Sequence, residues 1–452
     1  MESVVNCRGW KCNCRAAALL LLVFLLLSCT HEKPIAESHY DKVVLFYLDG
    51  NNNLSTDIGE NLDDIVSGSY IPLPMSNEAL FVYIQKENRV PQIEPYEQPT
   101  LLRLVNVDGR CVKLVEKIFD FKNSCEDSSM STVLSYVANN YPANENGLII
   151  SSHGTGYLPC FYHEDPNRFK LANNNLKMAA LASVEEGNTY DILTTGTRAV
   201  GDYIKTNAGV DIKDFCNLLP IRYDYVIFDC CLMGGVEVAY QLRNKADKVV
   251  FSQAEIPAKG MVYDKMCAAL FATGGADLMR VCQDYYNREY DGQIIENQSS
   301  IPTTEMNSGA TISLIDLSGM ESLAAICNKI LSYAGCEIPY INANNLQEFF
   351  RHWTPQRNFF YDLSDFVEEL VHLADSDHSD DIAMFNSALD DVVLYSAHTN
   401  WFMGEIELKK NCGLSVYVPL NYAAYHPYLN NYYKTLDWSI ATYGAEGEYF
   451  PY

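Results

Sequence analysis

The apolar residues of this chain fall into short runs bounded by polar turns, and these runs alternate with segments in which apolar residues recur at helical spacing. Short Val-, Ile-, Leu- and aromatic-rich runs of this kind are typical of strands covered on both faces. The predicted strands are 42–48, 79–84, 148–150, 225–228 and 248–252, and the predicted helices are 130–140, 212–219, 264–272 and 276–290. This alternation predicts an α/β fold with a mostly parallel sheet.

The chain also contains a predicted hairpin and a second region. Runs at 101–107 and 110–115 flank Asp108-Gly109, a dipeptide that favours a type I′ turn. A polar stretch at 296–308 indicates a boundary. The elements expected beyond it are strands at 310–315 and 413–418 and helices at 318–333 and 364–374. We therefore expect a main domain at 42–300 and a smaller α+β domain at 301–452.

Two of the predicted strands end in residues that carry chemistry. The strand at 225–228 runs into Asp229, Cys230 and Cys231, and the strand at 148–150 runs into His153. If these strands are parallel neighbours, His153 and Cys231 emerge at the same edge of the sheet, where open α/β sheets bind ligands. Such a pair is a nucleophile and a base. Taken alone, His153 is equally consistent with a structural histidine.

Two adjacent thiols, Cys230 and Cys231, are candidates for the nucleophile. If the extended conformation continues past the strand, Asp229 and Cys231 point to one face and Cys230 to the other. Helical spacing begins near Val236, and the N-terminus of a helix favours a thiolate over a thiol. A vicinal disulfide between the two cysteines, formed on oxidation, would silence the site.

These motifs resemble those of the caspase-like cysteine peptidases, and in detail those of the clostripain family. The quoted segments are S-H-G-T-G (152–156), F-D-C-C-L-M-G-G-V-E (228–237), Y-L-D-G-N-N-N-L (47–54), S-Q-A-E-I-P-A-K-G-M-V-Y (252–263) and G-L-S-V-Y-V-P (413–419). The resemblance implies a three-layer α/β/α sandwich in which 42–300 is catalytic. It aligns Cys231 with the nucleophile and His153 with the base of a dyad.

The resemblance also implies further roles. The oxyanion would be held by the main-chain N–H groups of Gly154 and Cys231, and Asp229 would line an S1 pocket that prefers Arg or Lys. Glu255 is a second candidate for that pocket. The chemistry would need no cofactor or metal, although family members suggest Ca²⁺. The turn 49–53 is rich in oxygen-bearing side chains. We interpret these as the Asp, Gly and Asn residues that commonly form turns, with a cation site as the alternative.

The irregular stretch 157–195 is long for a loop inside a compact domain, which is typical of a functional segment. In the clostripain family such a region carries a self-cleavage site after a basic residue. The candidates here, which the sequence does not rank, are Arg168, Lys170 and Lys177.

The N-terminus reads as a targeting segment. Basic residues precede an apolar stretch at 16–27, which is too short for a typical membrane-spanning helix and ends in Leu-Leu-Ser-Cys. This resembles a bacterial lipoprotein signal, with 1–28 removed, Cys29 lipidated and 29–41 serving as a tether at the cell envelope. The alternative is an ordinary secretory signal with an incidental cysteine.

The composition of the chain limits the classes of molecule that it is expected to bind. The formal net charge of −26 argues against nucleic acid and is typical of a solvated acidic surface. Of 15 cysteines, those outside the signal and Cys29 have no metal-site spacing, and residues such as Cys267, Cys282 and Cys327 read as small core residues. We therefore expect an exported, monomeric, lipid-anchored endopeptidase that acts on proteins or peptides with basic residues. The alternatives are a peptidase with a different P1 preference and a catalytically silent surface binding lipoprotein.

Overall fold

The computed structural model describes residues 39–87, 97–159, 209–298, 308–350, 359–374, 378–420 and 427–451. Residues Tyr40–Tyr452 form one compact unit. The signal segment, Cys29 and the three self-cleavage candidates Arg168, Lys170 and Lys177 lie outside the described residues. No helix within the described ranges is both long enough and apolar enough to cross a bilayer.

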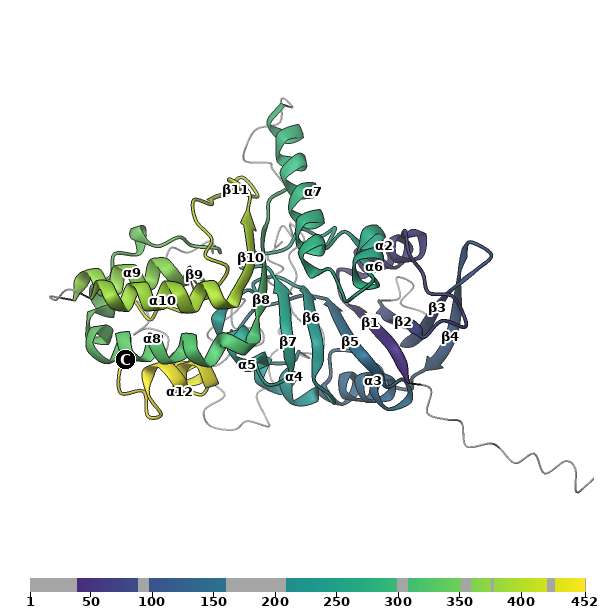
Figure 1. Ribbon diagram of the computed structural model, residues 1–452, viewed down its shortest axis with the longest axis horizontal. Coiled ribbons are helices and arrows are strands. Elements are labelled where there is room, and N and C mark those ends of the chain that lie inside the picture. The colour runs from purple at the N-terminus through teal and green to yellow at the C-terminus, as the bar shows by residue number, and fades with distance from the viewer. Residues whose placement is uncertain are drawn as a thin grey trace, which may run out of the picture. The chain divides into compact units, whose positions relative to one another are not determined.

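A nine-stranded sheet in the order β10-β8-β7-β6-β5-β1-β2-β3-β4 organises the compact unit (Figure 1). The strands are β1 (Tyr40–Gly50), β2 (Glu78–Lys86), β3 (Thr100–Val107), β4 (Arg110–Ile118), β5 (Ala143–Ser151), β6 (Tyr223–Asp229), β7 (Ala246–Phe251), β8 (Thr311–Asp316) and β10 (Val393–His398). The central strands from β7 to β2 pair in parallel, and antiparallel pairs lie outside them at both edges. This confirms the predicted α/β fold with a mostly parallel central sheet.

Helices cover both faces of the sheet, and the alternation of side chains along the strands shows why. In β1, Val43, Leu45 and Tyr47 join one hydrophobic core, whereas Val44 and Phe46 join the other. The first core is closed by α3 (Asp127–Asn140), α4 (Ile212–Leu218) and α5 (Val236–Leu242), and the second by α2 (Ser55–Ser67), α6 (Tyr263–Leu270) and α7 (Leu278–Gln298). The result is a three-layer α/β/α arrangement.

The hairpin between β3 and β4 forms as predicted. Asp108 and Gly109 have positive φ angles of 53° and 77°, the values that a type I′ turn requires at both central residues. The expected late strand at 413–418 is wrong in its extent, because only β13 (Ser415–Val416) is a strand, and it pairs with β9 (Tyr361–Asp362) outside the nine-stranded sheet. The apolar residues around β13 are buried but do not belong to a strand. The main-chain N–H of Ser415 donates to the carbonyl oxygen of Gly234, and no longer strand ladder forms among these described residues.

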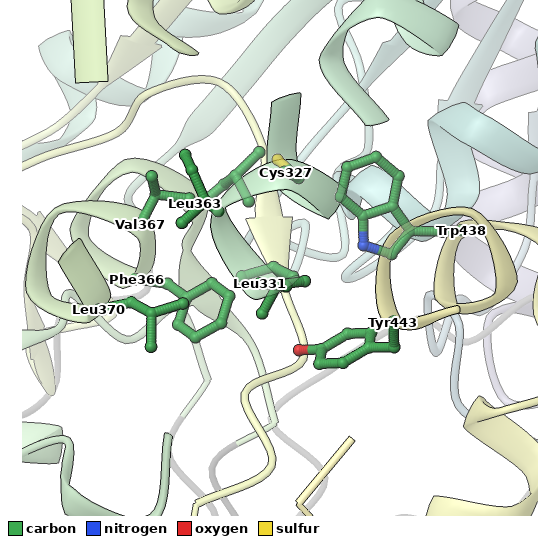
Figure 2. A pocket seen from close by; sticks show the side chains of 10 residues that line it. Cys327, Leu331, Leu363, Phe366, Val367, Leu370, Trp438 and Tyr443 are labelled. Carbon is green, nitrogen blue, oxygen red and sulfur yellow. The ribbon is translucent and has the colours of Figure 1, made fainter. Parts of the chain in front are cut away.

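Residues 301–452, for which a smaller α+β domain was expected, supply β8 and β10 to the nine-stranded sheet. The same region also contains α8 (Met320–Ala334), α9 (Leu363–Leu373), α10 (Ser379–Val392), α11 (Pro427–Tyr433) and α12 (Asp437–Tyr443), with the short strands β11 (Trp401–Phe402) and β12 (Ile406–Glu407). A small apolar cavity lies where α8, α9 and α12 meet, lined by residues such as Leu331, Phe366 and Trp438 (Figure 2). Its lining belongs to the first hydrophobic core, so the cavity is a packing feature.

Ten cysteines lie within the described residues, and none of these ten forms a disulfide. Cys267, Cys282 and Cys327 are fully buried among apolar side chains, as predicted. Burial raises the pKa of the Cys267 thiol to about 12, because a low-dielectric surrounding disfavours the thiolate. These cysteines therefore behave as small hydrophobic residues.

Candidate active site

The two strands that end in His153 and Cys231 are parallel neighbours. β5 pairs with β6 so that Ser151 lies opposite Asp229. His153 and Cys231 each stand two residues beyond that pair, and both therefore emerge at the carboxyl edge of the sheet. This edge is where open α/β sheets bind ligands.

Gly154 brings the main chains of the two motifs into direct contact. A Cβ atom added at Gly154 would lie 2.2 Å from the carbonyl oxygen and 2.8 Å from the amide nitrogen of Cys231. These distances are far below van der Waals contact, so only glycine fits there. The structure thus places the main chains of the two expected oxyanion donors, Gly154 and Cys231, side by side.

The Cys231 thiol is buried in a turn that is tied to the loop after β7. Cys231 is only 2% exposed, and its Sγ accepts a hydrogen bond from the main-chain N–H of Ile256 at 3.3 Å. Leu232, the next residue, has a left-handed φ of 62°, and its N–H donates to the Ala254 carbonyl oxygen at 3.0 Å. A non-glycine residue with positive φ is a strained feature that clusters at functional sites.

Cys230 contacts a different part of the protein. Its Sγ lies 3.5 Å from the carbonyl oxygen of Ile150 in β5, whereas Cys231 Sγ faces the loop after β7. The two thiols carry no disulfide. The two adjacent thiols therefore have different neighbours, although both residues are buried.

His153 is bonded to a residue that the sequence did not single out. Its Nε2 lies 2.5 Å from the Oδ1 oxygen of Asn53, which follows the carboxyl end of β1. β1 is the other parallel neighbour of β5, so the turn after β1 lies beside His153. The Asp-Gly-Asn-Asn-Asn run at a strand end was the signal that could have identified this partner.

The turn at 49–53 is tied to neighbouring segments through its first residue, Asp49. Asp49 is buried, and its carboxylate accepts hydrogen bonds from Ser124 Oγ at 2.7 Å, Cys125 Sγ at 2.8 Å and Ser152 Oγ at 3.1 Å. These three donors fix the orientation of the Asp49 carboxylate. Within the described ranges, no group of three or more His, Cys, Asp or Glu side chains is arranged to hold a metal ion.

The two candidates for the S1 pocket lie near Cys231 but differ in exposure. Asp229, the last residue of β6, is completely buried, and its Oδ2 accepts hydrogen bonds from Ser151 Oγ at 2.8 Å and from the Tyr263 hydroxyl at 2.5 Å. Glu255 is partly buried in the loop after β7, next to Ile256. The carboxylate of Asp229 is thus held from inside the protein in this structure.

Glu237 lies at the end of the motif 228–237, where the sequence alone indicated no role for it. The side chain is 1% exposed in the first turn of α5, and its Oε1 accepts from the main-chain N–H of Tyr417 at 2.8 Å and from the Tyr433 hydroxyl at 2.9 Å. Burial raises the pKa of the Glu237 carboxyl to about 7, because desolvation disfavours its charged form. Glu237 therefore connects the helix behind Cys231 to the C-terminal part of the chain.

Comparisons of the sequence and of the fold with known proteins agree with one another. The sequence model of the Clostripain family matches residues 46–446. Clostripain of Hathewaya histolytica is 23% identical over 254 residues, a match that covers 52% of this chain and 43% of that protein. The chain thus spans less than half the length of that relative.

Two solved structures have the same fold. One is described as an inactive zymogen C11 protease from Parabacteroides distasonis, with 22% identity, a TM-score of 0.66, and 89% of this chain and 97% of that chain covered. The other is described as a secreted C11 cysteine protease from Bacteroides thetaiotaomicron in complex with an irreversible peptide inhibitor, with 22% identity, a TM-score of 0.65, and 89% and 99% covered. At this identity the likeness establishes the fold.

Proposed function

Because the chain belongs to the clostripain family, we propose that it is a cysteine endopeptidase that cleaves peptide bonds after basic residues, with Arg preferred over Lys. The observation that carries this proposal is the β5–β6 pairing, which delivers His153 and Cys231 to one edge of the sheet. Gly154 adds support, because its contact with the Cys231 main chain leaves no room for a side chain.

The proposed reaction uses both residues. The Cys231 thiolate attacks the scissile carbonyl carbon and forms a C–S bond, while the N–H groups of Gly154 and Cys231 donate to the oxyanion. The C–N bond then breaks as His153 gives its proton to the leaving amine. His153 next removes a proton from a water molecule, which hydrolyses the thioester and regenerates the thiol. The other reactants are the peptide or protein substrate and this water molecule.

The basic P1 preference rests on the carboxylates beside Cys231. Asp229 is rigidly held at the end of β6 by Ser151 and Tyr263, and Glu255 lies in the adjacent loop. A negative charge in a partly desolvated pocket pairs with a P1 guanidinium, and a carboxylate that offers two oxygens favours Arg geometrically over Lys. The competing functions are a peptidase with a non-basic P1 residue and a silent binding protein on the same fold.

The decisive experiment compares the two neighbouring thiols. Cys231→Ala should abolish both cleavage and labelling by a thiol-directed peptide probe, whereas Cys230→Ala serves as the matched control and should retain both. The purified mature protein is profiled on a peptide library with P1 varied, with and without a calcium chelator. Absence of cleavage and labelling in the wild-type protein would favour the silent binding protein, and cleavage after non-basic residues would favour the other peptidase.

Self-processing and export complete the proposal. The basic residues Arg168, Lys170 and Lys177 are candidates for a self-cleavage site, and the fold is shared with a protein described as an inactive zymogen. Wild-type protein should split into two associated fragments, and Cys231→Ala should stay a single chain when it is prepared free of host proteases. A solved structure with the same fold is described as secreted, which supports export of this chain. The proposed lipid anchor at Cys29 rests on the apolar stretch that ends in Leu-Leu-Ser-Cys, and Ca²⁺ as an activator rests on resemblance alone.

A further inference from the structure

The hydrogen bond between Asn53 and His153 links the turn after β1 to the proposed base. Nε2 of His153 and Oδ1 of Asn53 are 2.5 Å apart, although 100 positions separate the residues in the chain. β1 pairs in parallel with β5 so that Leu48 lies opposite Ser151. The strand register therefore delivers the turn and His153 to the same place at the sheet edge.

The turn that carries Asn53 is held firmly by its other side chains. Asn52 Oδ1 accepts from the main-chain N–H of Leu54 at 2.9 Å, and Asp49 accepts from Ser152, the residue before His153, at 3.1 Å. Helix α2 begins directly after the turn at Ser55. Asn53 is the exposed member of the three consecutive asparagines, and its side chain is the one bonded to the imidazole.

The atoms of this contact determine which imidazole nitrogen is protonated. A carboxamide oxygen only accepts hydrogen bonds, so Nε2 must be the protonated nitrogen when it bonds to Oδ1. In the neutral ring the lone pair then resides on Nδ1, the nitrogen that receives the thiol proton and later returns a proton to the leaving amine. The same bond stabilises the imidazolium, because a charged donor strengthens a hydrogen bond.

We propose that Asn53 is a positioning residue of the active site, which fixes the tautomer and orientation of His153 and stabilises its protonated form. This inference rests on the proposed role of His153 as the base. It extends the arrangement from two side chains to three, contributed by the parallel neighbours β1, β5 and β6.

The test replaces Asn53 in the full mature protein in its active form. Asn53→Ala removes the acceptor, so kcat should fall roughly 10- to 100-fold, on the scale of one hydrogen bond to a charged group, with KM little changed. The imidazolium loses a partner, so the limb of the pH profile of kcat/KM that reports its ionisation should move to lower pH. Asn53→Asp keeps an acceptor and adds a negative charge, so activity should largely return and that limb should move to higher pH.

Asn52→Ala is the matched control, because its side chain bonds only to main-chain atoms of the same turn. It should lower Tm but leave the pH limbs in place. The inference is overturned if Asn53→Ala keeps the wild-type kcat and pH profile, or if it merely loses Tm as Asn52→Ala does. It is also overturned if Asn53→Asp moves the limb to lower pH, since the amide would then act as a donor.

His153→Ala separates this inference from the proposed function. If His153→Ala is inactive while Asn53→Ala behaves as the wild type, the role of Asn53 fails and the role of His153 stands. If His153→Ala retains full cleavage, His153 is not the base and both proposals fall. Rates of Cys231 alkylation against pH provide a second readout that needs no substrate.

Discussion

The Tyr263 hydroxyl donates a hydrogen bond to the Asp229 carboxylate at 2.5 Å, in a place where the Asp229 side chain has no exposed surface. Tyr263 begins α6, on the face of the sheet covered by α2, α6 and α7. The carboxylate is therefore anchored to the helical layer behind the sheet edge. A pocket charge held in this way would be rigid.

This relationship gives the first prediction. Asp229→Asn keeps the shape of the side chain and removes its charge, so kcat/KM for P1 Arg peptides should fall by ~100-fold or more, on the scale of breaking a buried ion pair. A matched P1 Ala peptide should be little affected, and thiol labelling of Cys231 should survive. The measurement is kcat/KM for matched P1 Arg, Lys and Ala peptides.

Tyr263→Phe is the control for that experiment, because it removes the hydrogen-bond donor and leaves the charge. It should reduce stability, since the buried carboxylate loses a partner, but the preference for Arg should remain. An undiminished Arg preference in Asp229→Asn would show that Asp229 is structural.

The second prediction concerns the close approach at Gly154. Gly154→Ala places a methyl group against the Cys231 main chain, 2.2 Å from its carbonyl oxygen, so one of the two chains must move. Displacing an oxyanion donor should lower kcat by about 100-fold or more. Gly59→Ala in α2 is the control, because its added methyl meets only Lys86 at ordinary contact distance, 3.6 Å. That variant should keep wild-type activity and gain a little in Tm.

The third prediction is a pH dependence of stability that arises from Glu237. Its folded pKa of about 7 is raised above the ordinary value of 4.5, so the folded protein binds this proton more tightly than the unfolded chain. The contribution is fully present below pH 4.5 and is lost as the pH rises to about 7, with a magnitude of roughly 3 kcal/mol. Tm measured across this range should therefore fall less steeply in Glu237→Gln than in the wild type. Parallel curves for the two proteins would contradict the prediction.

The fourth prediction tests the anchor. Cys29→Ala removes the residue that would carry the lipid, so the protein should shift from the detergent phase to the aqueous phase or accumulate with its signal uncleaved. Phase partitioning and N-terminal mass measurement distinguish these products. Unchanged partitioning together with normal cleavage after residue 28 would exclude lipidation of Cys29.

Much of the site could be predicted from the sequence because it depends on local patterns. An apolar run that ends in Ser152-His153-Gly154 and another that ends in Asp229-Cys230-Cys231 indicate strand ends, and parallel pairing then places both ends at one edge. The type I′ turn at Asp108-Gly109 was predictable for the same reason, since it is a property of two adjacent residues. The helix α10 and the edge strand β10 were not predicted; β10 is an edge strand without fully buried residues, whereas α10 does bury Phe385, Leu389 and Val392 at helical spacing and was missed despite that pattern.

The sequence by itself determined the alternation of strands and helices and the two motifs, including Gly154 in the first of them. Backbone preferences and burial patterns depend on residues that are close together in the chain. Only the tertiary structure decided which distant side chains meet. The bonds from Asn53 to His153, from Tyr263 to Asp229 and from Tyr433 to Glu237 join residues that are 100, 34 and 196 positions apart. Such contacts depend on strand register and helix packing, which arise from the whole core at once and leave no periodic trace in the chain.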